Sequence, residues 1–191
     1  MTDGPRRILL HGVTGSGKTS LALELGRLTG LPVLLADEDI GWLPGWNQRP
    51  AEEQRRIARE RASAPEWVFD TAYGPYRAEI AERADLILCL DYPRLVSMGR
   101  LIRRSIRRVV TAEPVCNGNT ETWRQLFSSD SILMWHARSF ASKRAQIKTL
   151  LAAEGPSKVV RFRSPHRTRS WLRLVAKNGR IPTRRAGDAA V

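Results

Sequence analysis

One stretch near the N-terminus limits the fold of this chain more than any other. Residues 8–10 are apolar, residues 12–19 read Gly-Val-Thr-Gly-Ser-Gly-Lys-Thr, and a helical pattern follows. The middle block fits G-x-x-x-x-G-K-[ST], the phosphate-binding loop between a strand and a helix. Main-chain N–H groups of such a loop point at phosphate oxygens, and the next helix offers its positive N-terminus to the same anion. The stretch therefore predicts a nucleoside triphosphate site.

Each residue type in this loop has a chemical reason. Glycines let the main chain wrap closely, Lys18 is long enough to reach the β- and γ-phosphates, and the Thr19 hydroxyl can bind Mg²⁺. We therefore expect ATP and Mg²⁺ as cofactors. The expected nucleotide-binding residues are Gly12, Val13, Thr14, Gly15, Ser16, Gly17, Lys18, Thr19 and Ser20.

Further apolar runs predict four more buried strands with helical segments between them. The runs are residues 31–35, 67–70, 85–91 and 158–163. Alternating strands and helices predict an α/β fold of the P-loop NTPase class, with a parallel sheet flanked by helices. Residues 111–121 contain Pro114 and Gly118 and are expected to form a mobile loop. We expect one domain over residues 1–176 and a basic, disordered tail over 177–191.

Carboxylates follow three of the expected strands. The acids are Asp37, Glu38 and Asp39 after the second strand, Asp70 after the third and Asp91 after the fourth. The carboxyl ends of parallel strands meet where such sheets bind ligands. Residues 37–39 are expected to hold Mg²⁺ or a substrate hydroxyl, a solvated acidic loop being the alternative. Asp70 and Asp91 are both candidates to join Thr19 in binding the metal.

Arginines repeat at helical spacing after the fourth strand. One stripe is formed by Arg100, Arg103, Arg104, Arg107 and Arg108. The opposite, apolar side is expected to pack on the core through Leu95, Met98, Ile102, Ile106 and Val109. Crowded guanidinium groups are unfavourable unless an anion is bound or water screens them. We expect one or two of them to stabilise a transferring phosphoryl group, a solvated basic face being the alternative.

Charge divides the chain into two halves. Residues 1–93 carry 11 Lys and Arg against 14 Asp and Glu, a net charge of −3, whereas residues 94–191 carry 21 against 5, a net charge of +16. Arginine predominates, and its planar group suits bidentate phosphate contacts. The second half is therefore expected to meet phosphate, on a nucleotide or on a nucleic acid.

The cysteines and the lengths of the apolar runs indicate where in the cell the protein is expected. Cys89 and Cys116 have no histidine at metal-ligand spacing, so a zinc site is not expected. The N-terminal apolar run is too short for a secretory signal, and no apolar run is long enough to span a bilayer. We expect a cytoplasmic protein without membrane contact.

Several motifs occur together along residues 6–175. They are the phosphate loop, Leu-Pro-Val at 31–33, Trp-Leu-Pro-Gly-Trp at 42–46, Asp-Thr-Ala-Tyr at 70–73, the arginine helix, Cys-Asn-Gly-Asn at 116–119 and Ser-Pro-His-Arg-Thr-Arg-Ser-Trp-Leu at 164–172. This set resembles a bacterial P-loop family described as adenylate-kinase-like or as DNA topology modulation proteins. More broadly the chain is similar to nucleoside monophosphate kinases and shikimate kinase. The resemblance implies a five-stranded parallel sheet of order 2-3-1-4-5, an acceptor flank near 37–65 and an arginine-bearing lid near 104–125.

The resemblance also implies roles for single residues. Lys18, Thr19 and Asp70 match positions that hold ATP and Mg²⁺. Candidates for lid and phosphoryl-stabilising cations are Arg103, Arg104, Arg107, Arg108, Arg138 and Arg144. Adenylate kinases follow the strand-end Asp with Gly-Phe-Pro-Arg, whose arginine grips the monophosphate, but residues 71–74 here read Thr-Ala-Tyr-Gly. AMP is therefore doubtful as acceptor. The expected acceptor pocket includes Trp42, Trp46, Tyr73 and, in place of the missing arginine, Arg77.

Two functions remain open. The first is a monomeric kinase that moves the γ-phosphoryl group of ATP to a small nucleotide or hydroxyl metabolite. The second is a nucleotide-dependent protein that binds nucleic acid through its basic half.

Overall fold

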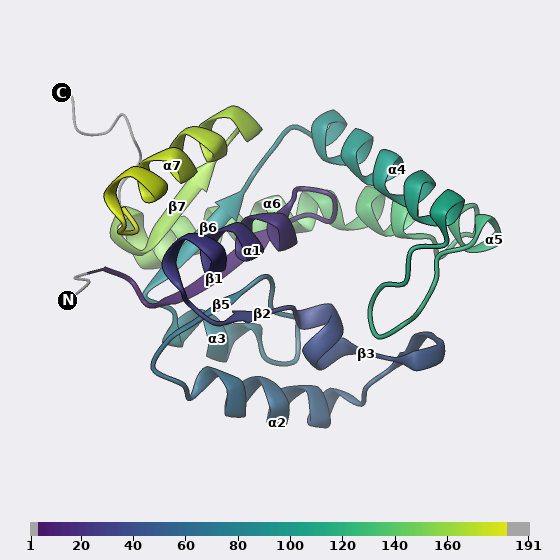
Figure 1. The fold of residues 1–191 in the computed structure, drawn as a ribbon, viewed down its shortest axis with the longest axis horizontal. Helices are drawn as coiled ribbons and strands as arrows, with labels where there is room; N and C mark the ends of the chain where they lie inside the picture. Colours follow the sequence, from purple (N-terminus) through teal and green to yellow (C-terminus); the bar gives the residue numbers. More distant parts are fainter. Residues whose placement is uncertain (1–3, 183–191) are drawn as a thin grey trace.

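A five-stranded parallel sheet forms the centre of the computed structural model, which describes residues 4–182 (Figure 1). The strands lie in the order β2-β5-β1-β6-β7. Counted along the chain as sheet strands one to five, this is the order 2-3-1-4-5 that the resemblance implied. The strands are β1 Arg7–Gly12, β2 Val33–Leu34, β5 Trp67–Phe69, β6 Leu86–Leu90 and β7 Val159–Phe162.

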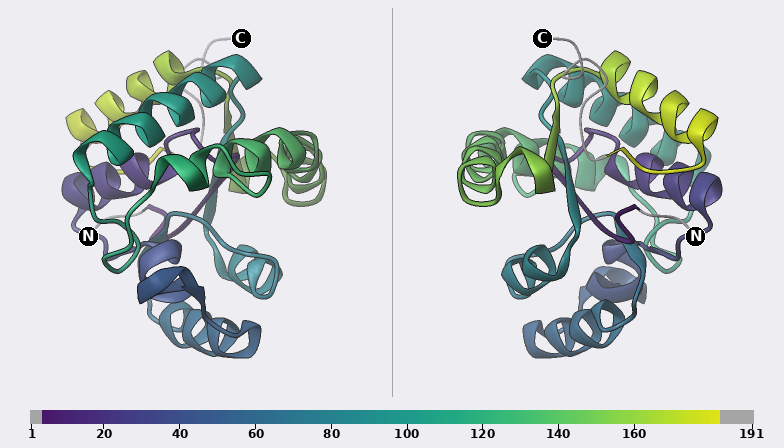
Figure 2. Two further views of the ribbon diagram at one scale, coloured as in Figure 1. Left: turned by 90° about the vertical axis from the view of Figure 1, so that its right-hand side faces the viewer. Right: turned by 90° about the vertical axis from the view of Figure 1, so that its left-hand side faces the viewer.

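Helices cover both faces of this sheet (Figure 2). Helices α1 and α7 pack on one face, and α3 and α6 pack on the other, with α2 beside α3 and α4 against α6. The helices are α1 Lys18–Thr29, α2 Ala51–Ala62, α3 Arg77–Arg83, α4 Arg94–Thr111, α5 Trp123–Leu126, α6 Ile132–Lys158 and α7 Pro165–Asn178. The expected architecture of a parallel sheet flanked by helices is confirmed.

Apolar side chains of the strands divide between the two faces. Ile8 and Leu10 of β1 pack in the cluster that contains Trp171 of α7, whereas Leu9 packs with Ile147 of α6. Successive strand residues point to opposite faces, so a strand between two helical layers needs an unbroken apolar run. For the same reason all five residues of β6 are buried.

The segment between β2 and α2 has short elements that the sequence did not predict. They are a π-helical turn η1 Ala36–Gly41, strand β3 Trp42–Leu43, a 3₁₀ turn η2 Pro44–Trp46 and strand β4 Asn47–Gln48. β3 and β4 pair as an antiparallel hairpin. Gly45 has φ of 76° in the turn, a conformation that glycine adopts without strain. We call residues 36–48 the acceptor flank.

Helix α4 does not bury the apolar stripe that was expected to face the core. Its buried residues are Ser97, Leu101 and Ser105. In the stripe predicted to face the core, Leu95 is 86% exposed, Ile102 39% and Ile106 41%, whereas Met98 and Val109 are half-buried. The inward side of α4 borders the polar phosphate loop, and within the arginine stripe Arg104 and Arg108 are half-buried whereas the other three arginines are exposed.

The packed chain extends beyond the predicted domain boundary at residue 176. Helix α7 continues to Asn178, and Ile181 is buried in the cluster between α1, α7 and the sheet. The expected disorder from residue 177 is therefore corrected for residues 177–182, and residues 183–191 lie outside the described residues. Within residues 4–182, no helix has the length and apolar character needed to cross a bilayer.

Candidate active site

The phosphate loop joins β1 to α1 at the carboxyl edge of the sheet (Figure 1). Gly15 has φ of 78°, and a Cβ atom there would lie 2.4 Å from the carbonyl oxygen of Ser97. Gly17 also has a positive φ, 96°, and helix α1 starts directly after it without a side-chain cap, as far as the described residues show. The first N–H groups of α1 are thus left for an anion, and the loop fits a nucleotide phosphate.

Lys18 lies folded over its own loop. Its Nζ donates to the carbonyl oxygen of Val13 at 3.0 Å, and the same oxygen accepts from Ser16 Oγ at 2.7 Å. Burial lowers the pKa of Lys18, and the nearby carboxylates of Asp70 and Asp37 oppose this shift. The Lys18 side chain is half-buried.

Two other expected loop residues are placed differently. Thr14 is half-buried, and Ser20 is exposed on the first turn of α1.

Asp70 lies directly after β5 and beside the loop. Its carboxylate accepts hydrogen bonds from the Thr19 hydroxyl at 2.7 Å and from the Ala36 N–H at 2.9 Å. Burial raises the pKa of Asp70, and these hydrogen bonds and Lys18 partly offset the shift. One carboxylate and one hydroxyl beside a phosphate site are donors that Mg²⁺ commonly combines with phosphate oxygens and water. The residues present therefore fit a nucleotide-bound Mg²⁺.

Asp91 is engaged elsewhere. It is 4% exposed, and it accepts from Arg144 Nε at 2.8 Å and from Arg161 Nε at 2.7 Å. Both carboxylate oxygens are thus held by guanidinium groups that tie β6 to α6 and β7. The interpretation of Asp91 as a metal candidate is corrected to a structural ion pair. Arg144, expected among the catalytic cations, is likewise bound to Asp91 rather than to the loop.

We expect Asp91→Asn to lower the free energy of unfolding by roughly 3 kcal/mol, because it leaves Arg161, 13% exposed, without its partner charge. Urea denaturation measures this loss. The affinity for Mg²⁺-nucleotide, measured by calorimetry below the unfolding transition, is expected to stay unchanged. In Asp70→Asn the opposite pattern is expected, with Mg²⁺-nucleotide affinity reduced. A folded Asp91→Asn protein with lost Mg²⁺ dependence would contradict the assignment.

Asp37 lies in η1 and is half-buried. Its carboxylate accepts a hydrogen bond from the Tyr73 hydroxyl, and its charge acts on Lys18 and Arg104. Burial, followed by the charge of Asp37, raises the pKa of Tyr73, so the phenol stays protonated at neutral pH. Two groups expected in the acceptor pocket, Asp37 and Tyr73, are therefore brought together.

The two neighbouring acids are placed differently. Glu38 and Asp39 are exposed, and the Asp39 carboxylate accepts from the Leu35 N–H at 2.6 Å, which closes the η1 turn. The alternative of a solvated acidic loop thus describes Glu38 and Asp39, whereas Asp37 is half-buried and bonded to Tyr73.

Arg104 is the catalytic candidate of α4 that reaches the loop. It is half-buried, and its charge acts on Lys18. Burial and the neighbouring Arg108 lower the pKa of Arg104, while Glu121 and Asp37 oppose the shift. Arg108 itself pairs with Glu121 at 2.9 Å. Arg104 is therefore placed to meet a phosphate at Lys18.

Other candidate arginines lie on the surface. Arg103 is exposed, and Arg107 is exposed and paired with Glu113 at 2.9 Å. Arg138 is exposed at the start of α6, 4.0 Å from Asp130. The structure does not bring these three side chains to the loop, and their expected catalytic role stays a prediction.

Arg100 was named in the arginine stripe but not among the catalytic candidates. Its Nη1 donates to the carbonyl oxygen of Ser16 at 3.1 Å, and its guanidinium carbon lies 5.6 Å from the ring centre of Tyr92. Arg100 precedes Arg104 by one helical turn, so the spacing itself places both on one side of α4.

Lys143 and His11 are two further residues near the loop that the expected site did not include. Lys143 of α6 is half-buried, and burial followed by the cations Arg77 and Lys18 lowers its pKa to about 8. His11 of β1 is buried, and burial followed by Lys143 and Lys18 lowers its pKa to about 3. Lys143 precedes the buried Ile147 by four residues, and a lysine on the inward stripe of a helix is a readable signal.

The loop of residues 112–121, which we call the lid loop, contacts the acceptor flank through asparagine side chains. Asn117 donates to the carbonyl oxygens of Glu38 and Trp42, both at 2.7 Å. Asn119 accepts from the Trp46 N–H at 2.7 Å. The tryptophans expected to shape an acceptor pocket thus provide main-chain contacts to the lid loop, and their rings meet edge to face at 5.6 Å.

We expect Asn119→Ala to loosen the lid loop, because the Trp46 N–H loses its acceptor at a site where Asn119 is 4% exposed. The expected loss of stability is about 2 kcal/mol. Hydrogen exchange of residues 112–121 should become faster. The control is Asn47→Ala, an exposed asparagine whose amide bonds Pro44 within the same turn. Equal exchange rates in both variants would show that the Asn119 hydrogen bonds do not hold the lid loop in place.

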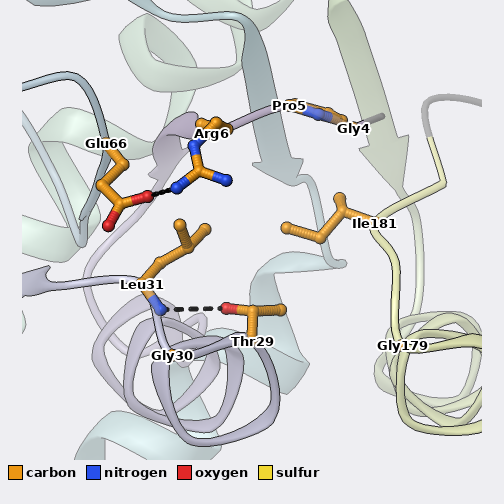
Figure 3. Close-up of a pocket in the computed structure, with 9 residues that line it drawn as sticks. All are labelled: Gly4, Pro5, Arg6, Thr29, Gly30, Leu31, Glu66, Gly179 and Ile181. Carbon is orange, nitrogen blue, oxygen red and sulfur yellow. Dashed lines mark hydrogen bonds and ion pairs between the residues drawn. The ribbon is translucent and has the colours of Figure 1, made fainter. Parts of the chain in front are cut away.

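Two hollows of the surface lie away from the loop. One of about 130 Å³ at the amino end of the sheet has the Arg6–Glu66 ion pair, Leu31 and Ile181 in its wall (Figure 3). The other, on α7, is lined by Arg169, Leu172 and Arg173. Sheets of this kind bind ligands at the carboxyl ends of their strands, so we assign the nucleotide to neither.

Comparison with known proteins identifies the fold. No family model matches the chain, and no curated protein matches its sequence. Among solved structures, shikimate kinase from Acinetobacter baumannii in complex with shikimate aligns with a TM-score of 0.55 at 18% identity, over 93% of this chain and 96% of that one. The chain has the P-loop kinase fold.

Two other kinases align similarly. Shikimate kinase from Bacteroides thetaiotaomicron gives a TM-score of 0.53 at 18% identity, over 92% of this chain and 98% of that one. Deoxyadenosine kinase from M. mycoides aligns with a TM-score of 0.53 at 11% identity, over 90% of this chain and 97% of that one. At these identities the likeness shows the fold alone.

Proposed function

We propose that this protein is an ATP-dependent phosphotransferase that moves the γ-phosphoryl group of ATP to a small nucleotide or hydroxyl metabolite. One observation carries the proposal: the Asp37 carboxylate accepts a hydrogen bond from Tyr73, and its charge acts on Lys18 of the phosphate loop. Lys18 is the group that reaches the β- and γ-phosphates in such loops. A switch that only binds and hydrolyses ATP needs the loop and the metal donors. A second carboxylate near Lys18, in addition to Asp70, is suited to bind an acceptor.

In the proposed reaction an acceptor oxygen bonds to the γ-phosphorus while the bond from that phosphorus to the β–γ bridging oxygen breaks. ADP leaves. Asp37 orients an acceptor hydroxyl and takes its proton. Lys18, Arg104 and the N–H groups of α1 stabilise charge on the phosphoryl oxygens. Mg²⁺ bound near Thr19 and Asp70 would neutralise phosphate charge. Such chemistry depends mainly on positioning and charge stabilisation.

We further infer membership of the adenylate-kinase-like family that the sequence resembles, within the nucleoside monophosphate kinase class. In support, two of its motifs that lie far apart in sequence meet in space: the asparagines of residues 116–119 bond the main chain of residues 42–46. We also infer a monomer that acts in the cytoplasm. Light scattering in solution tests the monomer.

The test is ATP turnover with Mg²⁺ against nucleoside monophosphates and small hydroxyl metabolites. We expect one acceptor to stimulate ADP formation many-fold and to carry the transferred phosphoryl group, as seen by mass spectrometry. Slow turnover that no acceptor in a broad panel stimulates would argue against the proposal.

The basic half supports a second candidate, nucleotide-dependent binding of nucleic acid. Arg103 and Arg107 are exposed on α4, and the exposed rings of Trp123 and Phe127 on the following segment stack with centres 6.1 Å apart. Bases stack on such rings, and cations bind the nucleic-acid backbone. This function predicts binding of single-stranded DNA or RNA that weakens steeply with salt. It also predicts that the double substitution Arg103→Ala and Trp123→Ala abolishes this binding and leaves ATP binding intact. No binding at moderate salt would exclude it.

A further inference from the structure

A buried hydrogen bond joins helices α4 and α6, which pack against each other (Figure 1). The hydroxyl oxygen of Ser97 in α4 lies 2.8 Å from Nε2 of His136 in α6, and both residues are 0% exposed. A serine and a histidine at this distance can serve as nucleophile and base. A substrate cannot reach a pair that is fully buried, so the role of this pair lies in how it holds the two helices.

The hydrogen atoms of this pair can be assigned from its neighbours. The Ser97 hydroxyl has one hydrogen, and it donates to the carbonyl oxygen of Arg94 at 3.1 Å. We therefore assign the ring hydrogen of His136 to Nε2, which donates to Ser97. Nδ1 is buried and has no hydrogen-bond partner among residues 4–182, so a charged ring would hold an unpaired N–H there. Burial, followed by the charge of Arg94, lowers the pKa of His136, in agreement with a neutral ring.

Ser97 also lies against the phosphate loop. A Cβ atom on Gly15 would meet the Ser97 carbonyl oxygen and would lie 2.8 Å from Cβ of Leu101, so α4 approaches the loop more closely than a side chain there would allow. Ser97 thus contacts the loop through its main chain and His136 through its side chain. A single residue of α4 connects the loop to α6.

Two arginines of α4 depend on this connection. Arg100, one turn after Ser97, donates to the carbonyl oxygen of Ser16 at 3.1 Å. Arg104 lies one turn further, and its charge acts on Lys18. Because a helix moves as a rigid element, a shift of α4 at Ser97 displaces both guanidinium groups relative to the loop. A displacement of about 1 Å can cost an active site about 100-fold in rate.

Other contacts of α4 define its position less closely. Arg94 donates to the carbonyl oxygen of Ala137 in α6 at 3.2 Å, but this hydrogen bond is exposed to water. Leu101 is buried, but apolar packing has no preferred direction. A buried hydrogen bond fixes both a distance and a direction. The bond between His136 and Ser97 is therefore the contact that determines how α4 is set on the loop.

We propose that His136 is a positioning residue of the phosphate site: its hydrogen bond to Ser97 sets α4 on the loop and thereby keeps Arg100 at the loop and Arg104 near Lys18. The inference rests on the proposed function and deepens it, because the alignment of two arginines is assigned to a residue of another helix. His136 itself is buried and touches no substrate.

A first experiment compares His136→Gln with His136→Asn. The glutamine amide reaches the place of Nε2 and can donate to Ser97, whereas asparagine is one methylene shorter and cannot. Calorimetry with Mg²⁺ and a non-hydrolysable ATP analogue should show about ten-fold weaker binding in His136→Asn, the size of one lost hydrogen bond, and a change below about three-fold in His136→Gln. In a transfer assay kcat/KM should follow the same order.

The two variants also separate positioning from packing. Both remove the ring that lies 5.6 Å from the ring centre of Phe140, so the melting temperature should fall in both. Folded His136→Asn and His136→Gln proteins with equal nucleotide affinity would overturn the proposal, because a purely structural histidine predicts that result.

A second experiment asks whether His136 acts through the two arginines. In a protein with Arg100→Met and Arg104→Met, the about ten-fold cost of His136→Asn should shrink below about three-fold, since coupled residues are not additive. The matched background is Arg173→Met with Lys177→Met, which removes two exposed charges from α7. There His136→Asn should keep its full cost. The same cost in both backgrounds would overturn the proposal.

The outcomes also distinguish this inference from the proposed function. The expected pattern of nucleotide affinity without transfer to any acceptor would support His136 as a positioning residue and count against the phosphotransferase. Transfer that His136→Asn leaves intact would do the reverse. If the unmodified protein binds no Mg²⁺-nucleotide, both are overturned.

Discussion

Replacing Lys18 with methionine is expected to lower kcat/KM for phosphoryl transfer about 1,000-fold, the upper range for loss of one preorganised donor in a water-poor site. Lys18 is half-buried at the N-terminus of α1, and it bonds a loop carbonyl that a phosphate oxygen would replace. Methionine keeps the length of the side chain and removes its charge. ADP formation in a coupled assay measures the loss.

We expect Lys18→Met to change the free energy of unfolding little. The hydrogen bond that it removes joins Lys18 to Val13 within the same loop. Thermal melting should therefore remain close to that of the unmodified protein. Lys148→Met, on the exposed side of α6, serves as control and should retain full turnover. If Lys18→Met turns over ATP within ten-fold of the unmodified protein, the loop is not the site of the chemistry.

For Asp37→Asn, transfer to the acceptor is expected to fall roughly 100-fold or more, the usual contribution of a positioned general base. Asparagine still fits beside Tyr73, but it cannot take the proton of an acceptor hydroxyl. Nucleotide affinity should change little, because Asp37 belongs to the acceptor flank and the nucleotide is bound by the loop and α1. Calorimetry with an ATP analogue and transfer kinetics separate the two effects.

Asp39→Asn provides the matched control for this prediction. Asp39 lies two residues later in the same turn, is exposed, and bonds the Leu35 N–H, a contact that the amide oxygen of asparagine can keep. Its transfer rate should stay within two- to three-fold of the unmodified protein. Equal losses in Asp37→Asn and Asp39→Asn would mean that both acids support only the conformation of the acceptor flank. The assignment of Asp37 as the proton acceptor would then be wrong.

The phosphate loop and the order of strands and helices can be predicted from the sequence. The phosphate loop is local: its glycines, Lys18 and Thr19 are adjacent in the chain, so their pattern predicts their geometry. The strands were also predictable, because burial on both faces requires unbroken apolar runs such as residues 86–90. Acids at strand ends could be located for the same reason, since the carboxyl ends of parallel strands meet at one edge.

Which of these groups share a site depends on how the helices and strands pack together. Asp70 and Asp91 look alike in sequence, but Asp70 meets Thr19 whereas Asp91 meets the arginines of β7 and α6. The arginine stripe of α4 was visible, yet its direction depends on the polar loop against which that helix packs. Lys143, more than 120 residues from Lys18, joins the site because α6 packs against β1. Spacing along a chain shows which residues share one element, but partners between elements depend on how those elements pack.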